Sequence, residues 1–92
     1  MKVLEKVEHK GDGHFESFVK LSIRRSISKE DLAYINNEII PITDLYYLQQ
    51  NEKYGLHICS FEMSKKPISM KKLIEKTKDL ATKTFKKFDK NI

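Results

Sequence analysis

The sequence has little of the residue types that crosslink or interrupt a chain: one cysteine, two prolines and three glycines in 92 residues. The single Cys59 cannot form an internal disulfide, which favours a reducing compartment. No apolar run approaches the ~18 residues of a membrane span, and the N-terminal segment lacks the uninterrupted apolar core of a signal peptide. We therefore expect a cytoplasmic protein that does not enter a membrane.

Catalytic and cofactor motifs are also absent. The sequence contains no glycine-rich phosphate loop, no paired-carboxylate signature and no serine-nucleophile elbow. His9 and His14 flank a turn that contains Asp12, but their spacing matches no metal-ligand signature. His57 and Cys59 lie in an apolar stretch, where a packed histidine and a buried free cysteine are the usual interpretation. The sequence therefore favours a protein without metal, cofactor or catalytic activity.

A chain of this length predicts one domain, spanning residues 1–92. So small a domain buries only about 60–65% of the surface that its unfolded form exposes. Association of two copies is a second source of burial, so we expect a homodimer.

The charge is unevenly distributed along the chain. Residues 64–92 contain ten lysines and three acidic residues, whereas residues 1–63 contain eight Lys or Arg and ten Asp or Glu. The net charge of +5 therefore arises in the last third of the sequence. Such asymmetry favours a polyanionic or acidic partner, and a merely solvated helix face is the alternative.

The hydropathy pattern predicts six elements. Segments 2–9 and 14–24 alternate like strands on either side of a turn, which predicts a β-hairpin. Gly11 and Gly13 are expected to supply the positive φ angles of this turn. Segments 43–50 and 56–63 are rich in aromatic and β-favouring residues and flank a second turn. Residues 29–39 lie between a capping Ser28 and Pro41, which predicts a helix of about three turns. Residues 70–90 follow a capping Ser69 and repeat apolar side chains at helical spacing.

The resulting order, ββαββα, predicts an α+β fold in the form of a two-layer sandwich. Hairpins pair locally, so we expect a four-stranded, mainly antiparallel sheet with two helices on one face. The order of the strands within the sheet stays open.

The uncovered face of this sheet is a candidate interface. If the helices cover the side that holds Val19 and Leu21, the other side displays Phe18 and one residue from each of two ambiguous pairs, Tyr46 or Tyr47 and Ile58 or Phe61. So apolar a face favours a dimer interface or a platform on which RNA bases stack. The candidate interface residues are Phe18, Tyr46 and Ile58.

Cationic side chains form a candidate binding surface. Lysines on the flanks of the predicted C-terminal helix can follow a phosphate backbone without reading its sequence. Arg24 and Arg25 are the only arginines, and guanidinium groups bind phosphate in a bidentate way. Alternatively, this pair anchors the end of its strand to acidic residues such as Glu30 or Asp31. The candidate nucleic-acid ligands are Lys20, Arg24, Arg25, Lys72, Lys76, Lys83, Lys86 and Lys87.

These features predict a small, basic, non-enzymatic binding protein that contacts nucleic acid or a nucleoprotein complex, as a phage or mobile-element accessory factor would. One alternative is a protein–protein interaction module or inhibitor that acts through the sheet face. Another is a metal-independent ribonuclease with His57, Arg24 and Tyr47 in a shared cleft. The size and charge are similar to those of small basic ribonuclease toxins, but no residue spacing matches such a toxin.

Overall fold

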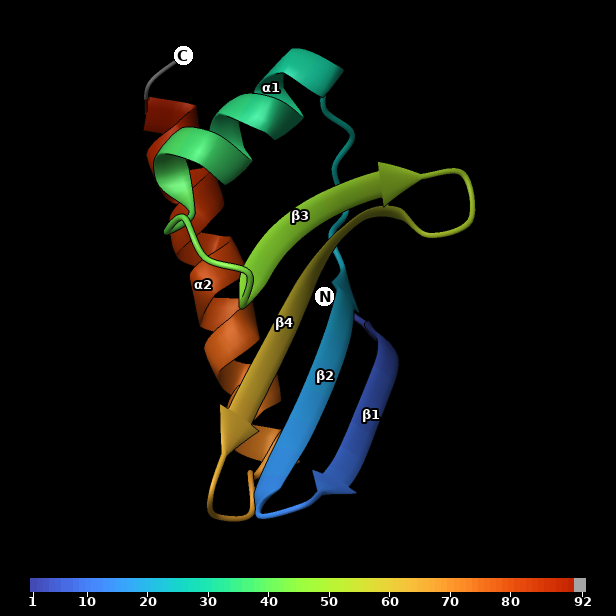
Figure 1. Ribbon diagram of the computed structural model, residues 1–92. Helices are drawn as coiled ribbons and strands as arrows, with labels where there is room; N and C mark the ends of the chain where they lie inside the picture. Colours follow the sequence, from blue (N-terminus) through green and yellow to red (C-terminus); the bar gives the residue numbers. More distant parts are fainter. Residues whose placement is uncertain (91–92) are drawn as a thin grey trace.

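A computed structural model describes residues 1–90, and the chain folds in the predicted order ββαββα (Figure 1). The strands are β1 (Val3–Gly11), β2 (His14–Ser22), β3 (Tyr46–Asn51) and β4 (Gly55–Ser64). The helices are α1 (Lys29–Tyr34), its π-helical continuation η1 (Ile35–Ile39) and α2 (Met70–Lys90). All six predicted elements are present, with boundaries within three residues of those expected.

The four strands form one antiparallel sheet in the order β1-β2-β4-β3. Each hairpin pairs within itself, and the two hairpins join where β2 runs beside β4. This central position explains why β4 is apolar on both faces, since Leu56, Ile58 and Cys59 are all almost fully buried. The sequence had left this strand order open.

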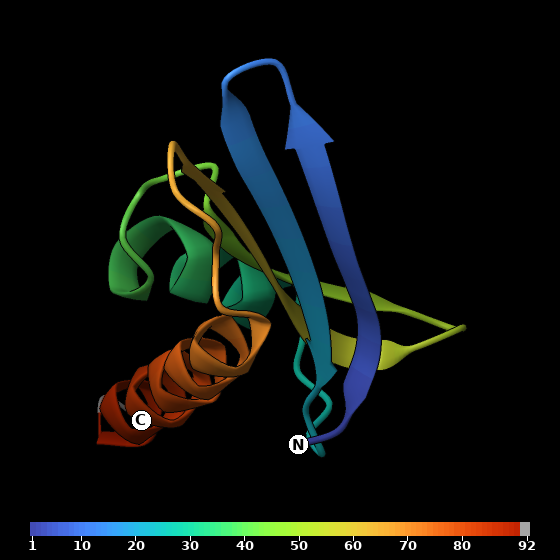
Figure 2. The same ribbon diagram turned by 90° about the horizontal axis from the view of Figure 1, so that it is seen from below.

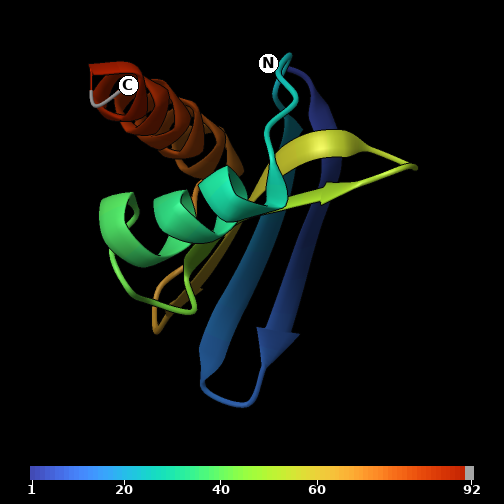
Figure 3. The same ribbon diagram turned by 90° about the horizontal axis from the view of Figure 1, so that it is seen from above.

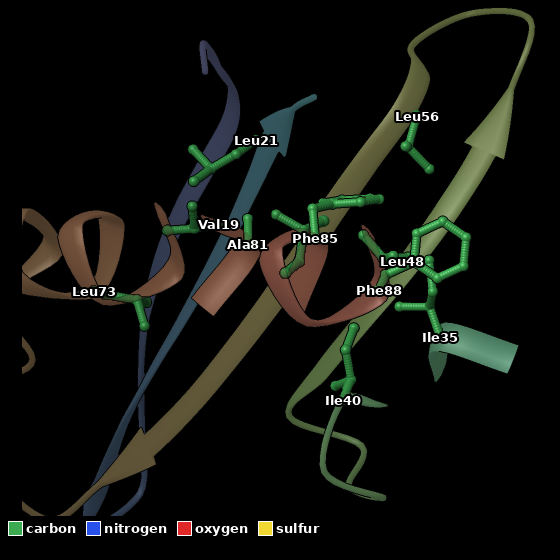
Figure 4. Close-up of a cluster of buried hydrophobic side chains, with 11 residues drawn as sticks. Val19, Leu21, Ile35, Ile40, Leu48, Leu56, Leu73, Ala81, Phe85 and Phe88 are labelled. Atoms are coloured by element: carbon green, nitrogen blue, oxygen red, sulfur yellow. The ribbon is translucent and has the colours of Figure 1, made fainter. Parts of the chain in front are cut away.

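Both helices lie on the same face of the sheet, which confirms the predicted two-layer α+β architecture (Figure 2). Their apolar sides meet Val19 and Leu21 from β2 in a core that also takes residues from β3, β4 and η1 (Figure 4). Ala81, at 2% exposure, brings no side-chain bulk to this contact, so the backbone of α2 can approach the sheet closely. Leu73 and Phe85 are also buried, so the predicted apolar stripe of α2 is confirmed.

The turns follow their local chemistry, with one difference from expectation. Gly13 and Gly55 have φ angles of +74° and +67°, values that residues with a Cβ rarely adopt. Gly11 does not have a positive φ, although the sequence suggested that both glycines of the first turn would. A Cβ at Gly11 would lie 2.6 Å from the imidazole of His14, so a larger residue there would displace that ring.

The first helix widens at its end. The Ile40 amide donates to the carbonyl oxygen of Ile35 at 2.9 Å, a bond to the fifth preceding residue rather than the fourth. Pro41 has no amide to continue the helix, so the predicted stop is confirmed. Asn36 lies in this widened segment and reaches the backbone of β3.

The register of the sheet corrects two assignments on the uncovered face. Tyr46 lies opposite Ser60 and Leu48 lies opposite Ile58, and all four side chains point toward the helices. Placing Tyr46 and Ile58 on the uncovered face was therefore wrong. Tyr47 and Phe61 occupy that face instead, together with Phe18, which was expected there and pairs with Phe61.

Candidate nucleic-acid interface

The outer side of α2 presents a row of lysines that we call the basic flank. Its members recur at intervals of three, four or seven residues, which keeps them on one side of a helix. They are Lys72, Lys76, Lys83, Lys87 and Lys90. All five are exposed, and the row spans about 27 Å along the helix axis at 1.5 Å per residue.

The lysines of the basic flank form no ion pairs with the described part of the chain. Within residues 1–90, no carboxylate lies within 4.0 Å of any of its ammonium groups. The same holds for Lys71, Lys78 and Lys86 on the adjoining side of α2, so neither Glu75 nor Asp79 forms an ion pair with a neighbouring lysine there. The charge is therefore available to a ligand.

Two hollows border the basic flank. One, of about 280 Å³, lies between α2 and the end of η1. Its apolar lining is Pro41, Tyr46 and Leu80, and its charged lining is Lys76, Lys83 and Asp79. The other, of about 360 Å³, lies at the start of α2, where Lys72 and Lys76 face Glu62. Each hollow therefore combines two lysines with one carboxylate, so neither is uniformly positive.

Arg25 is paired with a carboxylate of its own chain. Its Nη1 and Nη2 donate to the two carboxylate oxygens of Asp89, each at 2.9 Å. The guanidinium also lies 4.5 Å from the ring centroid of Phe85 and 5.8 Å from that of Phe88. The bonds from Arg25 lower the pKa of the Asp89 carboxyl. Anchoring to an acidic residue was the alternative to phosphate binding, with Glu30 or Asp31 as the suggested partner; the observed partner is Asp89.

The position of Arg25 ties the segment after β2 to the last turn of α2. The pair uses two of the five N–H donors of the guanidinium, and the Asp89 carboxylate offsets the charge that Arg25 would present to a phosphate. Arg24, its neighbour, is exposed and has no side-chain bond within residues 1–90. Of the two arginines, Arg24 is thus the one free to contact a ligand.

Lys20 lies on the opposite side of the sheet from the basic flank. Its Nζ is 3.8 Å from Glu5 Oε2 and 4.6 Å from the ring centroid of Tyr54. The Tyr54 hydroxyl donates to Glu5 Oε1 at 2.8 Å, so the β3–β4 turn folds back across β2 toward β1 (Figure 3). Lys20 is therefore half enclosed, and one ligand cannot reach it and α2 at the same time without surrounding the sheet.

Tyr54 also explains why the uncovered face contains fully buried polar residues. Its ring meets His57 edge-on, with centroids 5.6 Å apart, and His57 and Cys59 have no exposed surface. The imidazole Nδ1 of His57 lies 3.0 Å from the Gly55 carbonyl oxygen and its Nε2 lies 3.3 Å from Gln49 Oε1. The sequence pattern pointed to no role for Tyr54 on this face, and an aromatic residue next to a turn glycine was the one signal of it.

The ribonuclease interpretation needs an accessible histidine, and His57 is not accessible. Tyr47 does lie nearby, beside the Cys59 thiol, and burial is the main reason that the pKa values of both groups are raised. A raised pKa keeps the Cys59 sulfur as a thiol, which is a poor nucleophile. These groups therefore form a small packed polar cluster rather than a reactive cleft.

The other two histidines lie at the first turn. His14 Nε2 is 3.0 Å from Glu16 Oε1 and its Nδ1 is 3.1 Å from the Asp12 carbonyl oxygen, and the bond to Glu16 is the main cause of its raised pKa. His9 is exposed. Residues 1–90 contain no group of three or more His, Cys, Asp or Glu side chains arranged to hold a metal ion.

In the part of the chain that the structure describes, no helix is both long and apolar enough to cross a bilayer. Comparisons with protein-family models, with curated proteins and with solved structures find no match to this chain.

Proposed function

We propose that this protein binds nucleic acid through the basic flank of α2. The observation that carries the proposal is a row of five exposed lysines with no carboxylate partner within residues 1–90. The ammonium groups of exposed lysines without internal partners can contact phosphate groups. The release of counterions from the phosphates drives such binding.

The charge distribution supports this assignment. The segment from residue 64 onward carries ten lysines and three acidic residues, and one of those acids, Asp89, is already neutralised by Arg25. The rest of the chain contains more acidic than basic residues. A polyanion is therefore attracted to one side of the molecule and repelled from the remainder, which orients the encounter.

The geometry favours backbone contacts over base readout. The flank spans about 27 Å, which matches about eight base-pair steps of 3.4 Å along one duplex strand. Lysine is a flexible point charge, and contacts to phosphate carry no sequence information. We therefore expect affinity for generic duplex or single-stranded nucleic acid, with little dependence on sequence.

Fluorescence anisotropy with a labelled 20-base-pair duplex of arbitrary sequence tests the proposal. Five lysine–phosphate contacts give a slope of about −4.5 in log K against log salt, or a loss of about 500-fold between 50 and 200 mM. The variant K72Q/K83Q/K87Q leaves two contacts, so its slope falls to about −1.8 and its loss to about twelvefold.

The matched control is K2Q/K29Q/K53Q, which removes the same total charge from exposed positions outside α2. It should keep most of the wild-type slope. Equal slopes for the two triple variants would assign the binding to overall charge. Weak binding by the wild-type protein that does not change with salt would remove the proposal entirely.

The second candidate function is protein–protein interaction through the uncovered sheet face. Val7 and Met63 are more than half exposed there, beside the neighbouring Phe18 and Phe61. In that case Phe18→Asp, and not K72Q/K83Q/K87Q, should abolish partner binding. Circular dichroism must show that the Phe18→Asp chain is folded, because Phe18 is partly buried.

A further inference from the structure

The two edges of the sheet differ in how they are covered. At the β3 edge, the side-chain amide of Asn36 both donates to the Leu48 carbonyl oxygen at 2.9 Å and accepts from the Leu48 amide at 2.8 Å. The Gln50 side chain makes the same double contact with the backbone of Ile27. Nothing in residues 1–90 covers the β1 edge in this way, and β1 forms the free side of the sheet (Figure 1).

Hydrogen bonds at the end of β2 show which groups of β1 point outward. The Ser22 amide donates to the Lys2 carbonyl oxygen, whereas the next amide, of Ile23, donates to Leu56 on β4. Successive residues of a strand point their amide and carbonyl groups to opposite sides. The even-numbered residues of β2 therefore form their backbone hydrogen bonds with β1. Their partners are Glu5, Val7 and His9.

The residues between those partners therefore aim their amide and carbonyl groups away from the sheet. These are Lys6, Glu8 and Lys10, and all three are exposed. A strand of another molecule can bond to them without disturbing any bond within this chain.

We propose that the occupant of this edge is β1 of a second copy of the chain, paired antiparallel with Val7 opposite Val7. In this register Lys6 of each copy lies opposite Glu8 of the other, which gives two complementary charge pairs on the helix side of the sheet. Glu5 then comes opposite His9. Neither Lys6 nor Glu8 has a carboxylate or ammonium partner within residues 1–90 of its own chain.

The neighbouring registers are disfavoured by charge. Only residues with outward-pointing amide and carbonyl groups can bond across the interface, so one strand can shift against the other only by an even number of residues. The nearest alternative registers place Lys6 opposite Lys6 or Glu8 opposite Glu8. Like charges directly opposite one another destabilise a sheet. The proposed register is also the one that places Val7, 53% exposed in the single chain, against an apolar neighbour.

Such pairing joins two four-stranded sheets into one and keeps both helix layers on the same side. Two copies of the basic flank then lie on a common face of the dimer. This inference goes beyond the proposed function, since it needs no nucleic acid and can be tested in its absence.

The test is solution mass by sedimentation or light scattering across a concentration series. The wild-type chain should reach twice its 10.9 kDa mass. Either K6E or E8K alone turns both charge pairs into repulsions and should weaken dimerisation about tenfold or more. K29E, an exposed charge reversal away from the edge, is the control and should leave the dimer intact.

Two rescue experiments separate this register from a general charge effect. The double variant K6E/E8K restores opposite charges across the interface, so it should dimerise like the wild type. A mixture of the K6E chain and the E8K chain should form a heterodimer, because one presents two carboxylates and the other two ammonium groups. Failure of both rescues would overturn the register.

Proline at position 8 tests the backbone bonds directly. Glu8→Pro removes an outward amide and no bond to β2, so the monomer should fold while dimerisation is lost. A wild-type chain that stays monomeric up to millimolar concentration, or a Glu8→Pro chain that still dimerises, would overturn the proposal. A monomer would leave the edge to a strand of a different protein.

Discussion

Replacing Thr77 by valine tests how α2 is positioned on the sheet. Thr77 and Ser60 are both fully buried between α2 and β4. Thr77 Oγ1 lies 2.7 Å from the Leu73 carbonyl oxygen and 2.8 Å from Ser60 Oγ. A hydroxyl has one proton to donate, so Thr77 donates to Leu73 and must accept from Ser60.

Because of these donor and acceptor roles, the two single substitutions should differ in how much stability they remove. Thr77→Val keeps the volume but leaves the Ser60 hydroxyl buried without a partner, which costs about 1–3 kcal/mol. Ser60→Ala leaves the Thr77 hydroxyl still bonded to Leu73, so we expect a smaller loss of about 0.5–1.5 kcal/mol. Removing both hydroxyls leaves no unpaired group, so T77V/S60A should be more stable than Thr77→Val alone.

Urea unfolding followed by far-ultraviolet circular dichroism measures these differences. The denaturant slope should stay constant across the four chains, because the fold and the buried area do not change. If the losses of the two single variants simply add in the double variant, then Ser60 and Thr77 do not interact. In that case α2 would sit on the sheet in a different rotation, and the basic flank would not face outward as described.

Two further predictions concern other polar contacts. Arg25→Gln should lower stability above the ordinary Asp89 pKa of 3.8, and the pH-dependent part of that loss should vanish as acid titrates Asp89 through its lowered pKa. Unfolding measured from pH 7 to pH 2 gives this convergence, and a constant difference throughout would contradict an ionic role. Asn36→Ala should lower the free energy of unfolding by about 1–3 kcal/mol, and it should increase self-association because it uncovers the β3 edge. The control Asn37→Ala, at an exposed neighbouring position, should change neither.

Local pattern was sufficient to predict the elements and the layer arrangement. β2 alternates buried and partly exposed residues, so its inward side could be identified from Val19 and Leu21 alone. α2 was equally clear, because its apolar residues keep helical spacing over 21 positions. In both elements the burial of each side chain depends mainly on its own position in the repeat.

For β3 and β4, the sequence did not predict which side chains face the helices. β4 is apolar on both faces, so a choice between Ile58 and Phe61 depends on how it pairs with β2, about forty residues away in sequence. Tyr54 then covers the second face, which removes the contrast between buried and exposed positions that alternation normally provides. Assigning Tyr46 and Ile58 to the uncovered face failed for this reason.

The candidate site shows a similar limit for charged residues. The sequence contains eighteen cations and does not reveal which ones the fold uses for itself. Arg25 binds Asp89, and Lys20 lies between Glu5 and Tyr54, so both predicted ligands have internal partners. The exposed lysines of α2 have none within residues 1–90.

This difference separates two physical roles that the sequence merges into one net charge. A cation bonded within the fold contributes to stability, and its removal shifts the unfolding transition but leaves the salt dependence of nucleic-acid binding almost unchanged. A cation with no internal partner contributes little to stability, and its removal lowers the salt slope by about one unit for each phosphate that it had neutralised. Arg25→Gln and Lys83→Gln should therefore have opposite effects in the two assays, because the first group is bonded within the chain and the second is not.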